Sequence, residues 1–420
     1  MLTRRDFLQR TALVGTAGAL LPTVFQRAIF ASEQEGMVSP DQELKRTLVV
    51  IQLAGGNDGL NAVVPYGDGR YYSVRKTTAI PQNQVLQLNN EVGLHPSLAK
   101  FKDLWDAGVL GIVEGVGYPN PSYSHFESMR IWQSADPSQQ ATEGWLGKYF
   151  DSLKLDPHLF QGLCVGGNLA PSMQTPNMAV PVVQNVAAYQ LQGDAVAPQL
   201  ASDRLQALQQ LYSAIPASTP SAALLRSTLA AAQSTSKKLL EAEKAYVPAV
   251  QYPNTELATG LKLIAQAIDA DLGVQVCHVA IGGWDTHAAE LPAHSRLLTA
   301  LSESIYAFYQ DLKGHGKDKN VVVMTWSEFG RRVGENGSGG TDHGSAAPLF
   351  VVGTPVKGGL YGERPDLGKL DNGNLRFTTD FRSVYKTVLE DWLTAPADLI
   401  LGQKFEGLPL FRKDNAFLGR

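Results

Sequence analysis

Short apolar runs alternate along most of the chain with longer segments of helical periodicity. The runs span residues 47–53, 109–113, 179–183, 274–281, 321–325 and 349–352, and runs of this kind suit strands buried on both faces of a sheet. The helical segments between and after them span residues 98–107, 224–246, 257–271, 295–313 and 381–393. This alternation predicts an α/β fold of three layers, a doubly wound and mostly parallel sheet with helices on both faces.

The stretch from residue 187 to residue 253 interrupts this alternation. It is rich in alanine, glutamine and serine and is largely helical in pattern. We interpret it as a helical insertion within a single α/β domain that spans residues 46–420.

The N-terminus has the three regions of a signal peptide. Arg4 and Arg5 are followed by a polar residue, by Phe7-Leu8, by an uncharged stretch over residues 11–25, and by small residues ending at Ala31. The paired arginines predict a twin-arginine signal peptide over residues 1–31, and the polar residues 32–45 predict a flexible lead-in. The apolar stretch is short for a bilayer span, which needs about 20 residues.

We therefore expect export by the twin-arginine translocase to the periplasm or the medium, without a stable membrane span. A retained N-terminal anchor and a basic helix of the mature fold are the alternatives.

The net charge and the two cysteines limit the partners and covalent links that the sequence favours. The formal net charge of the 420 residues is −4, and the first 31 residues carry four arginines and one aspartate, or +3, which leaves −7 for the remainder. This acidic balance argues against a nucleic-acid partner. Cys164 and Cys277 both lie inside apolar runs, which favours small buried side chains, although the sequence leaves a disulfide between them open.

Carboxylates and histidines follow several of the predicted strands. Ligands of open α/β sheets bind at the carboxyl ends of the strands, so these residues are expected to meet at one edge. Such side chains ligate divalent metals, and converging carboxylates repel one another without a counterion. The pattern therefore predicts one or two divalent ions (Zn, Mn, Mg or Ca). The predicted ligands are Asp58, Asp285, His287, Glu328, Asp342 and His343.

Several of these residues also have a structural interpretation when each is taken alone. Asp58 lies in Asn-Asp-Gly, which is strong turn chemistry, and Asp285 could cap a following helix. Glu328 could pair with Arg331 or Arg332. The four segments taken together favour the metal site.

A second cluster, residues 120–127, precedes a predicted helix. Ser124 would lie at the helix N-terminus, where unpaired backbone N–H groups favour an anion and an activated oxygen nucleophile. The alternative is a capping box, in which Ser124 caps the helix and Glu127 stands three residues further on.

In combination, these motifs resemble a bacterial family of exported proteins catalogued as domain of unknown function fifteen-hundred-and-one. The resemblance runs from residue 48 to about residue 393. It is carried by the twin-arginine leader, Gly55-Gly56-Asn57-Asp58-Gly59-Leu60-Asn61, Ser124-His125-Phe126, Gly283-Trp284-Asp285-Thr286-His287, Ser327-Glu328-Phe329-Gly330-Arg331 and Asp342-His343-Gly344.

The family is distantly similar to the alkaline phosphatase and sulfatase superfamily, and this similarity implies an alkaline-phosphatase-like fold. It implies metal ligation by Asp58, Asp285 and His287, and Ser124 as the best match to the nucleophile. Phe329 follows Glu328 where the superfamily often has a histidine, and His343, with Asp342, would take its place.

The leading hypothesis is a secreted metal-dependent hydrolase of phosphate or sulfate esters that acts on a small-molecule or glycan ester. Ser124 or a water molecule would attack, and Arg331 or Arg332 would clamp the oxyanion. The alternative is a catalytically inactive relative that binds anionic envelope glycans.

Overall fold

The computed structural model describes residues 46–153, 160–189 and 235–413, with four isolated positions at 207, 210, 211 and 214. The predicted signal peptide, the lead-in and most of the predicted helical insertion lie outside these residues. At the two ends of that insertion, the described parts are α8 (Val186–Tyr189) and a helix over residues 235–245. Among the described residues, no helix combines the length and the apolar character needed to cross a bilayer.

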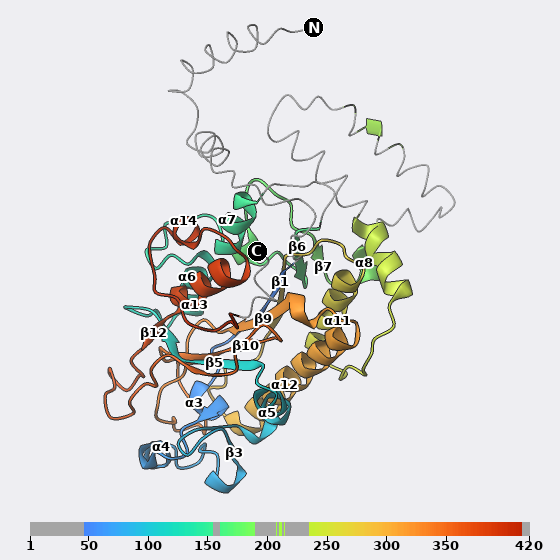
Figure 1. The fold of residues 1–420 in the computed structure, drawn as a ribbon. Helices are drawn as coiled ribbons and strands as arrows, with labels where there is room; N and C mark the ends of the chain where they lie inside the picture. The colour runs from blue at the N-terminus through green and yellow to red at the C-terminus, as the bar shows by residue number, and fades with distance from the viewer. Residues whose placement is uncertain are drawn as a thin grey trace, which may run out of the picture. The chain divides into compact units, whose positions relative to one another are not determined.

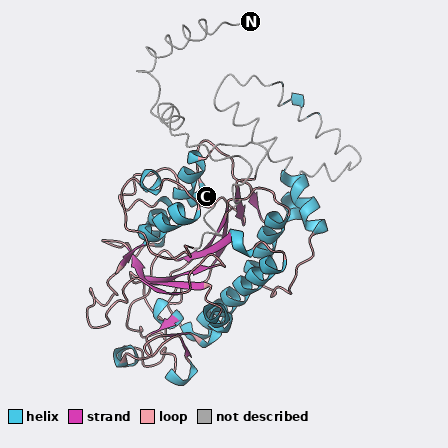
Figure 2. Ribbon diagram, in the orientation of Figure 1, coloured by secondary structure: helices cyan, strands magenta, loops and turns pink. Residues whose placement is uncertain are grey.

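A large sheet forms the centre of the described chain (Figures 1 and 2). Its strands have the order β11-β5-β10-β9-β1-β8-β6-β7, and β12 pairs with β5 beside this path. The strands are β1 (Thr47–Leu53), β5 (Leu110–Gly117), β6 (Gly162–Val165), β7 (Val182–Val183), β8 (Val276–Ile281), β9 (Val321–Trp326), β10 (Ala347–Val352), β11 (Gly359–Tyr361) and β12 (Thr379–Asp380). A small second sheet pairs β2 (Val63–Val64) and β3 (Leu86–Gln87) with β4 (Gly93–Leu94).

The pairing is mostly parallel, as the sequence predicts. Strand β1 pairs in parallel with β8 on one side and with β9 on the other. Strand β10 runs antiparallel to both β9 and β5, so β5 again points the same way as β1. The carboxyl ends of β1, β5, β8 and β9 therefore lie at one edge of the sheet, together with the amino end of β10.

Helices cover both faces of the sheet, which confirms the predicted three-layer α/β class (Figure 1). The first face packs on α5 (Ala99–Asp106), α11 (Glu256–Asp269) and α12 (Glu290–Gly314). The second packs on α6 (His125–Ser134), α7 (Trp145–Ser152), α13 (Phe381–Thr387), its π-helical continuation η7 (Val388–Trp392) and α14 (Ala397–Leu401). Two short helices, α3 (Gly59–Ala62) and α4 (Gly69–Val74), and the 3-10 turns η2 (Gln82–Gln84), η3 (Pro96–Leu98), η4 (Pro171–Met173) and η6 (Asp318–Asn320) complete the described elements.

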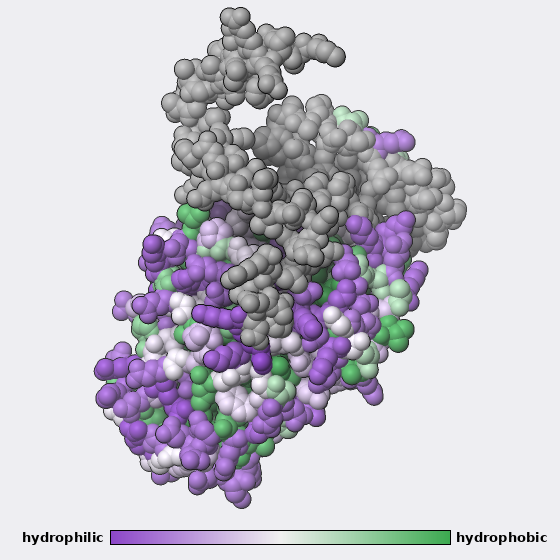
Figure 3. Space-filling view, in the orientation of Figure 1, coloured by the Kyte–Doolittle hydropathy of each residue, from purple (hydrophilic) through white to green (hydrophobic). Residues whose placement is uncertain are grey.

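The side chains of the central strand β1 point alternately to the two faces of the sheet and contribute to a hydrophobic core on each face. Val49, Ile51 and Leu53 face the core beneath α11 and α12, whereas Leu48 and Val50 face the core beneath α6 and α13. Side chains of a strand point alternately to its two faces, so a fully buried strand needs apolar residues at every position. The face of the molecule drawn in Figure 3 is largely hydrophilic, with apolar residues in small scattered groups.

The two cysteines lie on neighbouring strands, and both are free and buried. In the register of β6 and β8, Cys277 is paired with Leu163, and Cys164 is paired with His278. Cys277 packs in the core on one face of the sheet and Cys164 in the core on the other. The two thiols therefore point away from each other, and the structure excludes a disulfide between them.

Candidate metal centre

Five segments bring polar side chains to the same edge of the sheet. The loop after β5 leads to His125, the loop after β8 carries Asp285 and His287, and Glu328 follows β9 directly. The loop before β10 carries Asp342 and His343, and the loop after β1 contributes backbone groups. Five of the six predicted metal ligands are brought together here, and Asp58 is not among them.

His125 is the first residue of α6, and its ring bridges two carboxylates. Its Nδ1 lies 2.8 Å from Glu328 Oε1, and its Nε2 lies 3.4 Å from Asp285 Oδ2. An ionised carboxylate accepts hydrogen bonds and donates none, so the Nδ1–H of a neutral His125 donates to Glu328. The Nε2 lone pair is then directed toward Asp285.

His343 and His287 are held in the same way. His343 Nδ1 lies 2.7 Å from the carbonyl oxygen of Tyr123, and His287 Nδ1 lies 3.2 Å from Asp342 Oδ1. Both oxygens accept hydrogen bonds, so Nδ1 is again the protonated nitrogen of each neutral ring. Three imidazoles thus have Nδ1 fixed by an oxygen and Nε2 free to coordinate.

The free nitrogens all face the carboxylate of Asp285: that of His125 faces Oδ2, and those of His287 and His343 face Oδ1. His287 Nε2 and His343 Nε2 are 3.0 Å apart, and each lies 3.1 Å from Asp285 Oδ1. One ligand atom each of His125, Asp285 and His343 can be chosen so that all lie within 4.8 Å of one another. In a tetrahedral zinc site with bonds of about 2.0–2.1 Å, neighbouring ligand atoms are about 3.3 Å apart, close to these separations.

Two facing nitrogen lone pairs at 3.0 Å repel each other unless a positive charge lies between or beside them. A proton or a divalent cation supplies that charge. The donor set of imidazole and carboxylate suits zinc and other borderline divalent metals, and the oxygen acceptor behind each imidazole is the usual arrangement behind metal-bound histidine. The residues present therefore fit a divalent metal.

Arg331 lies buried beneath Asp285 and positions it. Its guanidinium donates to Asp285 Oδ1 at 2.7 Å, to the carbonyl of Thr341 at 2.9 Å, and to that of Trp284 at 3.0 Å. It also donates to the carbonyls of Gly55 and Gly56. Sequence analysis gave Arg331 the role of an oxyanion clamp, but its N–H groups are directed to protein oxygens, and the side chain is 1% exposed.

The same guanidinium shapes the charge of Asp285. Burial alone would raise the pKa of this carboxyl, but the hydrogen bond from Arg331 and the charge of its guanidinium hold the pKa at about 2. Asp285 is therefore ionised at any physiological pH and is available as an anionic ligand.

The loop after β1 holds Glu328 from below. Glu328 is fully buried and accepts the backbone N–H of Gly55 at 2.7 Å through the same oxygen that faces His125. Gly55 has φ +127°, and a Cβ there would lie 2.5 Å from the backbone nitrogen of Asp285. Glycine at this position lets the β1 and β8 loops approach closely enough to assemble the centre.

Phe329 packs against two of the ligand rings. Its ring centroid lies 4.4 Å from that of His343 and 4.8 Å from that of His125. The aromatic ring therefore lies where the resemblance led us to look for a histidine, and it restricts the orientations of the two imidazoles that are present.

Ser124, the predicted nucleophile, is the N-cap residue of α6. Its side chain makes no capping hydrogen bond, and the carboxylate of Glu127 accepts from Ser122 Oγ instead of completing a capping box. Ser124 lies between Tyr123, whose carbonyl holds His343, and His125. The serine is thus adjacent in sequence to two residues of the centre, and its hydroxyl is not used to cap the helix.

Asp58 occupies a different environment from the one predicted. Its carboxylate pairs with the guanidinium of Arg75, one contact being 2.9 Å, and both side chains are buried. Burial would raise the pKa of Asp58, but Arg75 holds it well below its usual range. Asp58 contacts the carboxyl of Glu290, whose pKa is raised by burial and by the charge of Asp58. Asp58 is therefore buried in an ion pair with Arg75, apart from the other five predicted ligands.

Sequence reasoning did not assign His125 to the metal. The residue stands in Ser124-His125-Phe126, in which the serine at a helix N-terminus is the more evident candidate for chemistry. The available signal was its position after a predicted strand of residues 109–113, the same position that singled out the other ligands.

The model of the family DUF1501, described as a protein of unknown function, matches residues 112–403. This range is more than half of the chain. The chain belongs to this family. The match includes His125, Asp285, His287, Glu328, Asp342 and His343, so every candidate ligand lies within the matched residues. No curated protein matches the chain in sequence.

Three solved structures illustrate the folds to which this family member is similar. They are the PsFucS1 sulfatase from Pseudoalteromonas sp. (12% identity, TM-score 0.39, 95% of this chain and 76% of that one), Ps i-CgsB in complex with a neocarrahexaose (11%, 0.36, 86% and 73%), and the alkaline phosphatase of the Antarctic bacterium TAB5 (10%, 0.32, 74% and 92%). At these identities and scores, the likeness assigns no activity and no residue role to this chain.

Proposed function

We propose that this protein is a metal-dependent hydrolase of phosphate or sulfate esters. The observation that carries the proposal is the convergence of three Nε2 atoms on Asp285, with each Nδ1 held by an oxygen acceptor. Such pre-oriented nitrogens beside an ionised carboxylate suit a divalent cation, and a mononuclear centre at a sheet edge suits ester hydrolysis.

His125, Asp285 and His343 would hold the ion, and His287 would complete the set. When bound, a divalent ion polarises an ester oxygen and stabilises the charge that develops on it. Glu328 and Arg331 act through the ligands: Glu328 fixes the tautomer and direction of His125, and Arg331 keeps Asp285 ionised and in place.

Ser124 is the candidate nucleophile on this side of the centre. Its place at the N-terminus of the ten-residue helix α6 puts unpaired backbone N–H groups and the positive end of the helix dipole next to the attacking oxygen. A water molecule in the same position is the alternative nucleophile.

Arg332, rather than Arg331, is the candidate clamp for the ester oxygens. Its side chain is exposed, and its backbone N–H donates to the carbonyl of Asp342. The pKa of Asp342 lies below its usual range because Asn336 and His287 hydrogen-bond to it and because Arg332 places positive charge nearby.

The test combines metal content with turnover. We expect the wild-type protein, reconstituted with Zn, Mn, Mg or Ca, to retain a divalent ion and to hydrolyse p-nitrophenyl phosphate or p-nitrophenyl sulfate. The double variant Asp285→Ala/His343→Ala should lose both. His315→Ala is the matched control, because this histidine also pairs with a carboxylate, that of Asp269, away from the centre.

Separate outcomes distinguish the parts of the proposal. Retention of metal and activity in the double variant would refute the site. Metal binding without turnover of either ester would favour the alternative of a non-catalytic protein that binds anionic glycans. Loss of turnover with retained metal in Ser124→Ala would favour the serine as nucleophile, whereas full activity would favour water.

We also propose export through the twin-arginine route, on the strength of Arg4-Arg5 and the apolar stretch that follows. Replacing both arginines by lysine should leave the precursor in the cytoplasm. Arg10→Lys keeps the same net charge in the same segment and should not block export. Equal export of the two variants, measured by cell fractionation, would contradict the route.

A further inference from the structure

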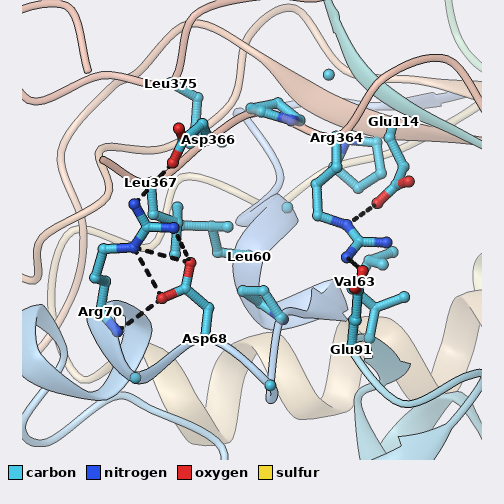
Figure 4. Close-up of a pocket in the computed structure, with 18 residues that line it drawn as sticks. Leu60, Val63, Asp68, Arg70, Glu91, Glu114, Arg364, Asp366, Leu367 and Leu375 are labelled. Carbon is cyan, nitrogen blue, oxygen red and sulfur yellow. Dashed lines mark hydrogen bonds and ion pairs between the residues drawn. The ribbon is translucent and has the colours of Figure 1, made fainter. Parts of the chain in front are cut away.

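A cavity of about 510 Å³ lies apart from the metal centre, and none of its lining residues belongs to that centre (Figure 4). Its walls come from α3, from the segment 65–70, from the carboxyl half of β5, and from the long loop before β12. Apolar side chains and prolines form much of the lining, namely Leu60, Val63, Pro65, Val92, Pro348, Pro365, Leu367 and Leu375.

One side of the cavity carries Arg70 between two carboxylates. The guanidinium donates to both oxygens of Asp68, at 2.7 to 3.1 Å, and to Asp366 Oδ1 at 2.8 Å. Figure 4 shows this group facing the cavity beside Leu367.

The other side carries a second guanidinium in the same arrangement. Arg364 donates to Glu114 Oε1 at 2.7 Å and to Glu91 Oε2 at 2.9 Å. Figure 4 places this group across the cavity from Arg70, with Leu60 between the two. Two ion-paired guanidinium groups thus line the same cavity.

Glu114 is the buried member of this lining. Its side chain is 9% exposed, and its Oε1 is bonded to Arg364. Among the described residues, no side chain donates a hydrogen bond to its second oxygen. A carboxylate that is nine-tenths buried and lines a cavity is a ready acceptor for a ligand hydroxyl.

The charges restrict the kind of ligand. Two guanidinium groups and four carboxylates give the lining a formal charge of −2, which disfavours a phosphate, a sulfate or another anion. The carboxylates are engaged with arginine, so they are not arranged around a free cation. Paired acceptors and donors between apolar walls suit a ligand whose groups both donate and accept, as sugar hydroxyls do, while its C–H faces contact leucine and proline.

We propose that this cavity binds a neutral saccharide unit. Glu114 and Asp68 accept from hydroxyls, and Arg364 and Arg70 donate to them. The site stands independently of the metal centre, and no ester group is required of its ligand. The loop that supplies Leu375 to the cavity also reaches the centre, because the neighbouring Asn374 donates to the hydroxyl of Tyr123 at 3.1 Å.

The test is a calorimetric titration of the mature protein with maltose, cellobiose, lactose and N,N′-diacetylchitobiose, each at up to millimolar concentrations. At least one should bind saturably. Glu114→Gln, which keeps the size but removes the charge of the buried acceptor, should weaken binding about tenfold, the loss of one charge-assisted hydrogen bond. Leu367→Trp, which fills the cavity, should abolish binding without touching an ion pair.

Two controls keep the outcome specific. Arg364→Lys should weaken binding, whereas Arg382→Lys should not, because Arg382 is likewise paired with a carboxylate, Asp380, outside the cavity. Asp285→Ala/His343→Ala should bind the sugar as wild type does, whether or not the metal proposal holds. Absence of binding by all four sugars, unchanged binding in both Glu114→Gln and Leu367→Trp, or competition by inorganic sulfate would overturn the proposal.

Discussion

At the scale of single residues, the candidate centre depends on buried groups that hold the converging side chains in place. Glu328 and Arg331 are buried, and each is bonded to a residue that lies at the point of convergence. Sequence patterns identified most of the candidate ligands because they stand after predicted strands. The pattern cannot separate a ligand from the residue that orients it, because both are polar and both lie at the same sheet edge.

The Glu328–His125 contact gives the first prediction. Glu328→Gln keeps the side-chain shape but replaces the ionised acceptor of the His125 N–H, so divalent-metal affinity should fall about 10- to 100-fold. Competition with a chromophoric chelator measures this. Glu127→Gln, on the exposed side of α6, should leave the affinity unchanged. Equal affinities of Glu328→Gln and wild type would show that the contact does not support the site.

A second prediction concerns Arg331. Lysine has one ammonium group and cannot reach the five oxygens that the guanidinium holds, so Arg331→Lys leaves buried carbonyls without a donor. We expect the free energy of unfolding to fall by about 3 kcal/mol in chemical denaturation. The exposed neighbour Arg332 offers the control. Arg332→Lys should change the free energy of unfolding by less than about 0.5 kcal/mol.

At the scale of elements, the strand directions decide which loops meet. Parallel β1, β8 and β9 end at one edge, and antiparallel β10 begins there, so its preceding loop contributes Asp342 and His343. Helix α6 then adds His125 at its first residue. The sequence predicted the strands as apolar runs. Such a run does not indicate whether the strand is parallel or antiparallel to its neighbours in the sheet.

The β1 loop gives the prediction at this scale. Gly55→Ala forces a Cβ against the β8 loop at a backbone φ that L-residues rarely adopt, so it should destabilise the fold by about 2 to 4 kcal/mol and weaken metal binding. Gly282, in the β8 loop, has open space and no left-handed φ. Its alanine variant should remain near wild type in thermal unfolding, and a similar loss in both variants would contradict the close-approach argument.

At the scale of the whole molecule, two helical layers bury the sheet and also enclose polar groups that do not belong to the candidate centre. Asp58, Arg75 and Glu290 form such a group, and they come from the β1 loop, the end of α4 and the start of α12. Thr341 donates to Glu290 at 2.8 Å, and its carbonyl accepts from Arg331. The buried carboxyl pair is therefore connected by hydrogen bonds to the candidate centre.

This pair predicts how stability depends on pH. Burial and the charge of Asp58 raise the pKa of Glu290 to about 9, whereas an unfolded glutamate has a pKa of about 4.3. Between these values the folded chain binds the extra proton, so the stability contribution is complete below about pH 4.3 and is lost as the pH rises toward 9. Glu290→Gln cannot ionise and should have a flatter profile of unfolding free energy over this range. Parallel profiles for the two proteins would exclude the pair as the cause.

The sequence alone determined the fold class, the family and most of the residues that gather at the site. Apolar runs of strand length and helical periodicity specify a buried α/β sheet, because burial on two faces requires apolar side chains at every position. Polar residues placed after such strands are predictable for the same reason, and Asp285, His287, Glu328, Asp342 and His343 do lie together.

The tertiary structure decided what each of those residues does. Asp58 is an ion-pair partner because Arg75 folds back on it from 17 residues away, and Arg331 is a positioning residue because five oxygens from other segments surround its guanidinium. The strand register separates Cys164 from Cys277. Hydrogen bonds and burial between distant segments fix these roles, and a local pattern contains neither.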